Sequence, residues 1–263
     1  MTSAVELFDT HAHLDHVDFA DCLSEVLDRA AQAGVTSILS LGTTLASSRA
    51  NVLLAERFAS IYAAAGIHPN HCAESADSDW DEVVKLYDHP RVVAVGETGL
   101  DRYWDFVRFD VQQDYFDRHL RAAQARDLPV VIHMRDCEAD VLAMLREALK
   151  RGPLRGVMHS FAASESGALE CLEMGLYISF AGMVTYKKSD ELRRIAALIP
   201  EDRILVETDS PYLSPHPFRG QKPNEPARVV HTAQCLADAR ATSLATFAAL
   251  AAANARRLFN KTQ

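Results

Sequence analysis

The sequence has 263 residues, 48% hydrophobic and 24% charged, and a formal net charge of −9. This is the composition of an ordinary globular protein with a sizeable core, which excludes intrinsic disorder, collagen-like repeats and a coiled coil. The acidic balance argues against a long non-specific track along nucleic acid, because such a track needs a basic surface. It does not argue against a site that holds a strand end through metal ions.

The cysteines and the apolar stretches indicate the cellular compartment of the protein. The five cysteines are scattered and form no CxxC pair, which argues against a disulfide framework or cysteine-bound zinc and suits a reducing compartment. Glu6 and Asp9 interrupt the apolar N-terminal stretch, so we expect no signal peptide. The stretch Leu244–Ala253 is shorter than the roughly 20 residues that span a bilayer. We therefore expect a cytoplasmic protein with no membrane contact and no obligate protein partner.

Short β-branched apolar runs alternate with longer amphipathic segments along the whole chain. We predict strands at Val5–Phe8, Thr36–Leu41, Ile61–Gly66, Val92–Gly96, Val130–His133, Gly156–His159, Leu176–Phe180 and Ile204–Glu207. Helix-like segments between them include Cys22–Ala33, Arg108–Arg126, Asp136–Lys150 and Asp190–Ile199, and one or two closing helices fall within Ala241–Arg257. Strands that are apolar throughout are typical of a parallel sheet covered on both faces.

About eight βα units in a chain of this length predict an α/β protein with a single (β/α)8 TIM barrel. A doubly wound open sheet is the alternative, but no GxGxxG motif follows the first strand. No low-complexity linker divides the chain, so we expect one domain over residues 1–263. In such a barrel the active site lies at the C-terminal ends of the strands.

Side chains that bind metals occur at five of these predicted strand ends. They are His11 and His13 after the first strand, Glu97 after the fourth, His133 and His159 at the ends of the fifth and sixth, and Glu207 and Asp209 at the eighth. Residues two apart in extended backbone point the same way, so His11 and His13 can face one ion. Each residue alone is typical of structural or solvated groups, but together they favour a metal site of Zn, Mn, Ni, Fe or Mg. Six of these seven side chains acting as ligands would exceed the needs of one tetrahedral ion and would suit two ions bridged by a carboxylate.

Seven motifs distributed over nearly the whole chain point to a family. They are DTHAHLD at Asp9–Asp15, GIHP at Gly66–Pro69, GETGLD at Gly96–Asp101, IHMRD at Ile132–Asp136, HSF at His159–Phe161, ETDSPYLSP at Glu207–Pro215 and FRGQKPNEP at Phe218–Pro226. In combination they closely resemble the TatD-type metal-dependent deoxyribonucleases, a branch of the amidohydrolase-like barrels. Ala162 and Ala163 depart from the family pattern of a hydroxyl residue and glycine, in a turn that holds no ligand.

The resemblance implies two divalent ions, which would be Mg, Mn or Zn, and hydrolysis of DNA phosphodiester bonds by a 3′-5′ exonuclease acting on single-stranded ends. The ligands that it implies are His11, His13, Glu97 and Asp209 for one ion and Glu97, His133 and His159 for the second. Glu97 would bridge the ions, which would lower the pKa of a water molecule and neutralise phosphoryl charge. Asp209 would take the proton of that water, and Glu207 would orient a ligand histidine.

Candidate substrate contacts are less specific. The cationic candidates are Arg135, Arg219 and Lys222, which suit phosphate oxygens but are also typical of solvated surface charge. His68 ends the third predicted strand and could bond a phosphate or leaving oxygen, or support the structure. Tyr103 and Trp104 follow the Glu97 motif and could stack a base, although packing in the core or loop is the more common role of such residues.

Two other functions remain compatible with the sequence. The same ions could polarise the carbonyl of a small amide or ester, or of a D-aminoacyl-tRNA, although no lysine ends a predicted strand where a carbamylated bridge would lie. A non-catalytic barrel with a structural ion, or an interaction module, is the second alternative. The full set of ligands argues against it, because a structural ion needs no open coordination position.

Overall fold

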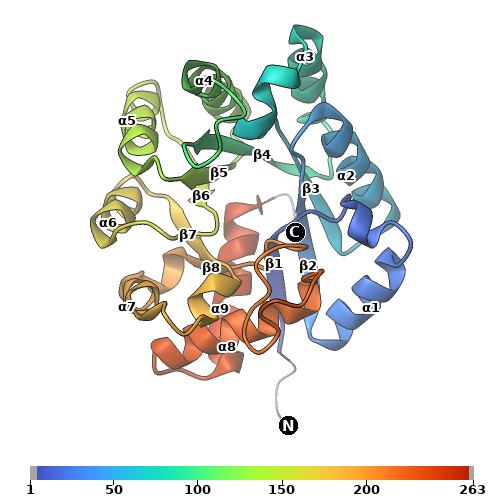
Figure 1. Ribbon diagram of the computed structural model, residues 1–263, viewed down its shortest axis with the longest axis vertical. Coiled ribbons are helices and arrows are strands. Elements are labelled where there is room, and N and C mark those ends of the chain that lie inside the picture. The colour runs from blue at the N-terminus through green and yellow to red at the C-terminus, as the bar shows by residue number, and fades with distance from the viewer. Residues whose placement is uncertain (1–4, 261–263) are drawn as a thin grey trace. The chain divides into compact units, whose positions relative to one another are not determined.

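The structure is a computed structural model that describes residues 5–260. Eight parallel strands form one sheet whose order follows the chain from β1 to β8, and helices alternate with them (Figure 1). This arrangement confirms the predicted (β/α)8 fold class. The described chain divides into two compact units, residues 5–40, 160–162 and 178–257 (unit 1) and residues 41–159, 163–177 and 258–260 (unit 2). One domain over residues 1–263 stays a prediction.

Unit 1 contains the first and last parts of the fold. Its strands are β1 (Leu7–Ala12), most of β2 (Val35–Leu41) and β7 (Tyr177–Phe180), and β8 (Ile204–Val206). Its helices are α1 (Leu23–Gln32), α7 (Asp190–Leu198), α8 (Val229–Ala239) and nearly all of α9 (Leu244–Leu258), with short 3-10 turns at Val17–Phe19, Gly182–Thr185, Glu201–Arg203 and Pro226–Arg228. Every residue of β1 and β8 is buried, as expected for strands covered on both faces.

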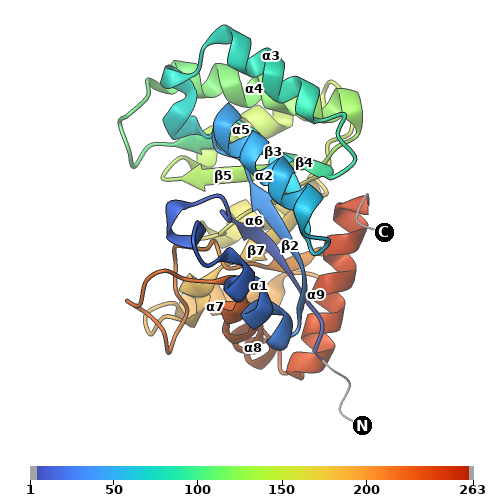
Figure 2. The same cartoon turned by 90° about the vertical axis from the view of Figure 1, so that its right-hand side faces the viewer.

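Unit 2 contains the middle of the chain. Its strands are β3 (Ile61–Ala65), β4 (Val92–Asp101), β5 (Val130–Arg135) and β6 (Gly156–Met158). Its helices are α2 (Leu45–Arg57), α3 (Asp77–Leu86), α4 (Phe109–Arg126), α5 (Glu138–Leu149) and α6 (Glu165–Glu173), with a 3-10 turn at Pro69–Glu74. Strand β4 pairs in parallel with β3 and β5, and α2 and α4 pack on β3 and β4. Figure 2 shows the connection between β4 and α4 extending outward beyond the end of β5.

Strands β1 and β4 extend furthest beyond their predicted ends, and both additions carry site residues. Strand β1 runs on through His11, because its polar residues find partners inside unit 1; Thr10 Oγ1, for example, donates to the Val206 carbonyl at 3.1 Å. Strand β4 continues through Glu97 to Asp101, where Gly99 pairs with His133. A Cβ atom at Gly99 would lie 1.9 Å from the His133 carbonyl oxygen, so only glycine allows this close pairing.

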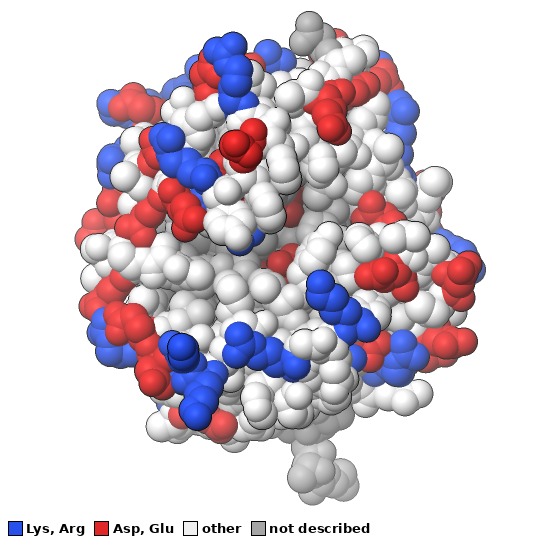
Figure 3. All heavy atoms as spheres, viewed as in Figure 1, with Lys and Arg blue, Asp and Glu red and all other residues white. Residues whose placement is uncertain are grey.

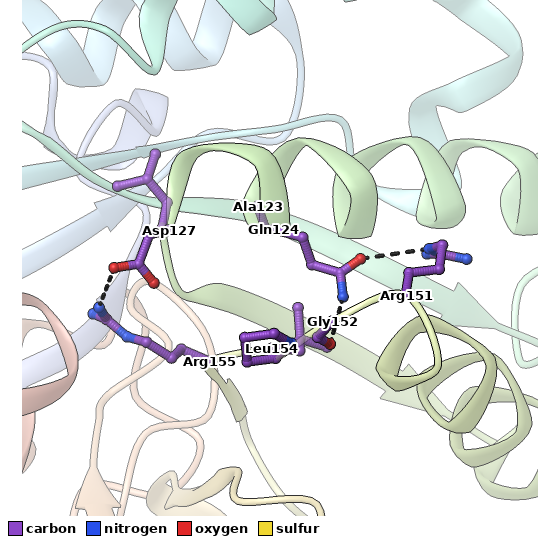
Figure 4. A pocket seen from close by; sticks show the side chains of 9 residues that line it. Ala123, Gln124, Asp127, Arg151, Gly152, Leu154 and Arg155 are labelled. Carbon is purple, nitrogen blue, oxygen red and sulfur yellow. Dashed lines mark hydrogen bonds and ion pairs between the residues drawn. The ribbon is translucent and has the colours of Figure 1, made fainter.

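A pocket of about 310 Å³ lies on unit 2 where the chain enters β5 and β6 (Figure 4). Its polar groups are paired with one another or with close neighbours. Arg155 contacts Asp127 at 3.4 Å, Gln124 donates to the Gly152 carbonyl at 2.8 Å, and Arg151 pairs with Asp117 outside the pocket at 2.8 Å. These pairs join segments at the amino ends of the strands, which in this fold serve stability.

Candidate metal centre

The unit 1 donor cluster consists of His11, His13 and Asp209. Both histidines lie on one side of the chain at the end of β1, two residues apart, and Asp209 follows β8. The His11 and His13 Nε2 atoms are 3.3 Å apart, and the Asp209 Oδ1 atom lies 3.6 Å from the first and 3.5 Å from the second. Neighbouring ligands of a tetrahedral ion with bonds of about 2.1 Å are about 3.4 Å apart. The three atoms therefore fit a divalent ion.

Backbone and hydroxyl contacts hold this cluster together. The buried Asp9 carboxylate accepts hydrogen bonds from Thr208 N at 2.9 Å and Thr208 Oγ1 at 2.6 Å, while burial raises the pKa of Asp9 to about 8. Asp209 has a left-handed backbone (φ 56°), and its N–H donates to the His11 carbonyl at 2.8 Å. This role of Asp9 was not predicted from the sequence, although a carboxylate directly after an apolar run was an available signal.

Glu207 also belongs to unit 1 and is 1% exposed. Its Oε1 atom accepts a hydrogen bond of 2.7 Å from the backbone N–H of Ser160, the residue after His159. The carboxylate thus holds the start of the turn that follows this histidine. Its predicted role, to orient a ligand histidine, stays a prediction.

The unit 2 donor cluster consists of Glu97, His133 and His159. The Glu97 Oε1 atom lies 2.9 Å from His133 Nδ1 and 2.9 Å from His159 Nε2, and those two nitrogens are 3.3 Å apart. Adjacent ligands of an ion are about 3.0 Å apart in octahedral and about 3.4 Å apart in tetrahedral geometry when the bonds are about 2.1 Å. These atoms therefore also fit a divalent ion. Glu97 is 3% exposed, so water screens its charge little.

Asp101 sets the orientation of His133. Its Oδ2 atom lies 3.0 Å from His133 Nε2, which leaves Nδ1 facing Glu97, and it also accepts from Asn70 Nδ2 at 3.2 Å. Although burial alone would raise the pKa of Asp101, hydrogen bonds from His133 and from the Trp104 backbone hold it at about 2. A carboxylate behind a ligand histidine fixes its tautomer and ring orientation. Asp101 was not found from the sequence, because its position on β4 has meaning only once β4 is known to continue past Glu97 and to pair with β5.

His68 lies beside the unit 2 donor cluster, three residues past β3 rather than at its end. Its Nδ1 atom accepts from Asn70 N at 3.1 Å, so in the neutral ring Nε2 carries the hydrogen, 3.4 Å from Glu97 Oε1. Burial lowers the pKa of His68 to about 4, so the ring is neutral at pH 7. His119 supports this segment, because its Nε2 accepts from Ile67 N at 3.0 Å.

The other candidate contacts lie at the surface. Arg135 is exposed at the end of β5, with its guanidinium carbon 3.6 Å from the centre of the Tyr103 ring. Arg219 and Lys222 lie in the exposed segment after β8, where Arg219 stacks on Tyr186 at 4.3 Å. On the face drawn in Figure 3, acidic and basic side chains are interspersed. Within residues 5–260 no helix is long and apolar enough to cross a membrane.

Comparison with known proteins identifies relatives along the full fold. Residues 8–260 match the family described as TatD related DNase. The chain is 38% identical over 253 residues to an uncharacterized metal-dependent hydrolase, YabD, of Bacillus subtilis, covering 96% of this chain and 98% of the relative. It is 35% identical over 257 residues to a protein of Citrobacter koseri named 3′-5′ ssDNA/RNA exonuclease TatD, covering 96% and 98%.

A solved structure extends this likeness to three dimensions. The TatD homologue YJJV of Escherichia coli has a TM-score of 0.91 and 32% sequence identity, covering 98% of this chain and 99% of that one. The family match and this fold agree with one another. The chain belongs to the TatD family of metal-dependent hydrolases.

Proposed function

We propose that this protein removes nucleotides from the 3′ end of single-stranded DNA by hydrolysing phosphodiester bonds with two divalent ions. The observation that carries the proposal is the spacing of donor atoms, which is 3.3–3.6 Å in the unit 1 donor cluster and 2.9–3.3 Å in the unit 2 donor cluster. Imidazole and carboxylate donors without thiolate suit the ions of hydrolytic sites. A relative named as a 3′-5′ ssDNA/RNA exonuclease supports the choice of substrate.

The proposed ligand assignment is the one that the family resemblance implies. The unit 1 donor cluster would hold one ion and the unit 2 donor cluster the other, with Glu97 serving both. When bound, divalent ions lower the pKa of a water molecule and neutralise charge on phosphoryl oxygens.

The remaining steps belong to side chains of this chain. Asp209 would accept the proton of the attacking water, and Glu207 would keep a ligand histidine in position. His68 is neutral at pH 7 with its hydrogen on Nε2, so it would donate to a phosphate or leaving oxygen without adding charge. Arg219 and Lys222 would contact phosphates farther from the reacting bond.

The test is a panel of substrates offered to protein stripped of metal and then loaded with Mg, Mn or Zn. End-labelled linear and circular single-stranded DNA, double-stranded DNA, RNA and D-aminoacyl-tRNA are compared. We expect stepwise shortening of linear single strands from the 3′ end, only when metal is present. Release of D-amino acid without DNA cleavage would assign the site to ester hydrolysis. Full ion occupancy with no hydrolysis of any substrate would favour a non-catalytic barrel.

A further inference from the structure

Three neighbouring aromatic side chains project into solvent from the connection between β4 and α4. Tyr103 is 53% exposed, Trp104 41% and Phe106 64%. Single exposed apolar residues are normal on protein surfaces, but a contiguous group marks a binding surface. In the described part of unit 2, the other exposed large apolar side chains are Leu53 and Leu169, which lie on separate helices.

The three rings form an ordered surface. Trp104 and Phe106 are stacked, with an interplanar angle of 10° and ring centres 5.1 Å apart, and Tyr103 meets Trp104 edge-on at 4.8 Å. The guanidinium of Arg135 lies over the Tyr103 ring at 3.6 Å and makes no ion pair with the residues that the structure describes. The surface therefore combines flat apolar rings with an uncompensated positive charge. This combination fits a flat ring that carries a phosphate.

Asp101 connects this surface to the unit 2 donor cluster. Its Oδ1 atom accepts from the N–H groups of Tyr103 at 2.8 Å and Trp104 at 3.0 Å, while Oδ2 bonds the ring of His133. Arg135 lies two residues beyond His133 on β5, about 7 Å along the strand. One buried carboxylate thus holds both a metal-donor histidine and the start of the aromatic segment, so a ligand on the rings lies next to the donors.

We propose that Tyr103, Trp104, Phe106 and Arg135 form a stacking platform for bases of single-stranded nucleic acid next to the reacting end, with Arg135 on a phosphate. This inference rests on the proposed nuclease function and adds how the strand is held. Stacking on aromatic rings accepts every base, so the platform serves an enzyme that removes nucleotides without regard to sequence. It also supplies affinity that the acidic surface as a whole does not.

The test measures binding by protein stripped of metal, so hydrolysis plays no part. A fluorescently labelled oligothymidylate and an abasic oligonucleotide of the same length are compared by anisotropy. Wild type should bind the oligothymidylate about 10- to 100-fold more tightly. Trp104→Ala should remove that difference, Trp104→Phe should retain most of it, and the control Leu53→Ala on α2 should leave it unchanged.

Other outcomes decide against the platform. Equal binding of the two oligonucleotides by wild type, no binding up to millimolar concentrations, or an undiminished preference in Trp104→Ala would each overturn it. Self-association that Trp104→Ala abolishes, without base-dependent binding, would assign the rings to a second copy and overturn it too. Base-dependent binding without metal-dependent cleavage would instead refute only the nuclease function. Metal-dependent cleavage with the same KM for both oligonucleotides would refute only the platform.

Discussion

The two donor clusters offer the same ligand chemistry but are supported differently. In the unit 1 donor cluster, His11 lies in β1 and His13 directly follows it, and this segment is held by backbone hydrogen bonds and by Asp9 with the hydroxyl of Thr208. In the unit 2 donor cluster, the ligands come from β4, β5 and the residue after β6, and the charged carboxylate of Asp101 orients His133. The unit 1 donor cluster is thus held by backbone and hydroxyl contacts, whereas the unit 2 donor cluster is held by an ionised carboxylate.

The strongest way to break this comparison is to remove the residue that both ions are proposed to share. Glu97→Gln should lower the rate of hydrolysis by at least about 1,000-fold, because metal ions contribute several kcal/mol to such reactions. It should also lower the metal content of both sites, whereas His133→Ala should empty one. Elemental analysis with circular dichroism as a folding control measures this. Two ions retained in Glu97→Gln would show that it does not bridge.

A second test compares the two donor clusters by changing a residue that holds each cluster while leaving the donor residues themselves in place. Asp101→Asn keeps the size of the side chain but removes its charge, so metal affinity should fall by about 10- to 100-fold at one of the two sites. Thr208→Val is the matched control in unit 1, where the support is neutral, and it should change affinity less. Calorimetric titration with Zn or Mn gives both values. Unchanged affinity in Asp101→Asn would mean that the carboxylate serves only the loop.

The sequence indicated candidate ligands more readily than the residues that contact them. His11, His13, Glu97 and Asp209 stand out because metal-binding side chains at predicted strand ends are chemically distinctive, and their role as ligands stays a prediction. The ends of β1 and β4 were predicted too early, since polar residues inside a strand look like its end until their partners across the sheet are known. Asp101 was missed for the same reason, because its role depends on pairing between β4 and β5, which no local pattern encodes.

The pH dependence of the free energy of unfolding tests the structural role of His119 in unit 2, separately from metal binding and hydrolysis. Burial lowers the pKa of His119 to about 4 in the folded protein, against an ordinary value of 6.5. Between these values the unfolded chain binds more protons, so the free energy of unfolding should fall by about 3 kcal/mol as the pH drops from 6.5 to 4. His119→Asn should lose the part of this pH dependence that His119 contributes, while the part from His68, whose pKa is also lowered to about 4, remains. The variant should also be less stable at pH 7. Urea unfolding at several pH values measures it, and parallel profiles for the two proteins would contradict it.

The smallest expected effect is a change in the salt dependence of DNA affinity when one arginine is removed from either unit. Each phosphate that is neutralised on a single strand contributes about −0.7 to the slope of log affinity against log salt, so two or three contacts predict a slope near about −2. Arg219→Ala in unit 1 and Arg135→Ala in unit 2 should each make the slope shallower by about 0.7 without changing metal content. A steep wild-type slope, or rapid cutting of circular single strands, would reveal an extended groove in place of end recognition.

The central claim is that two donor clusters make this chain a metal-dependent hydrolase of DNA ends. The most direct test is to titrate metal into protein stripped of metal and to follow the 3′-5′ shortening of linear single-stranded DNA in the same samples. We predict no activity without metal, saturation at two ions per chain, and activity that follows the second ion. Full activity at verified zero metal, or saturation with one ion and undiminished activity, would contradict the account.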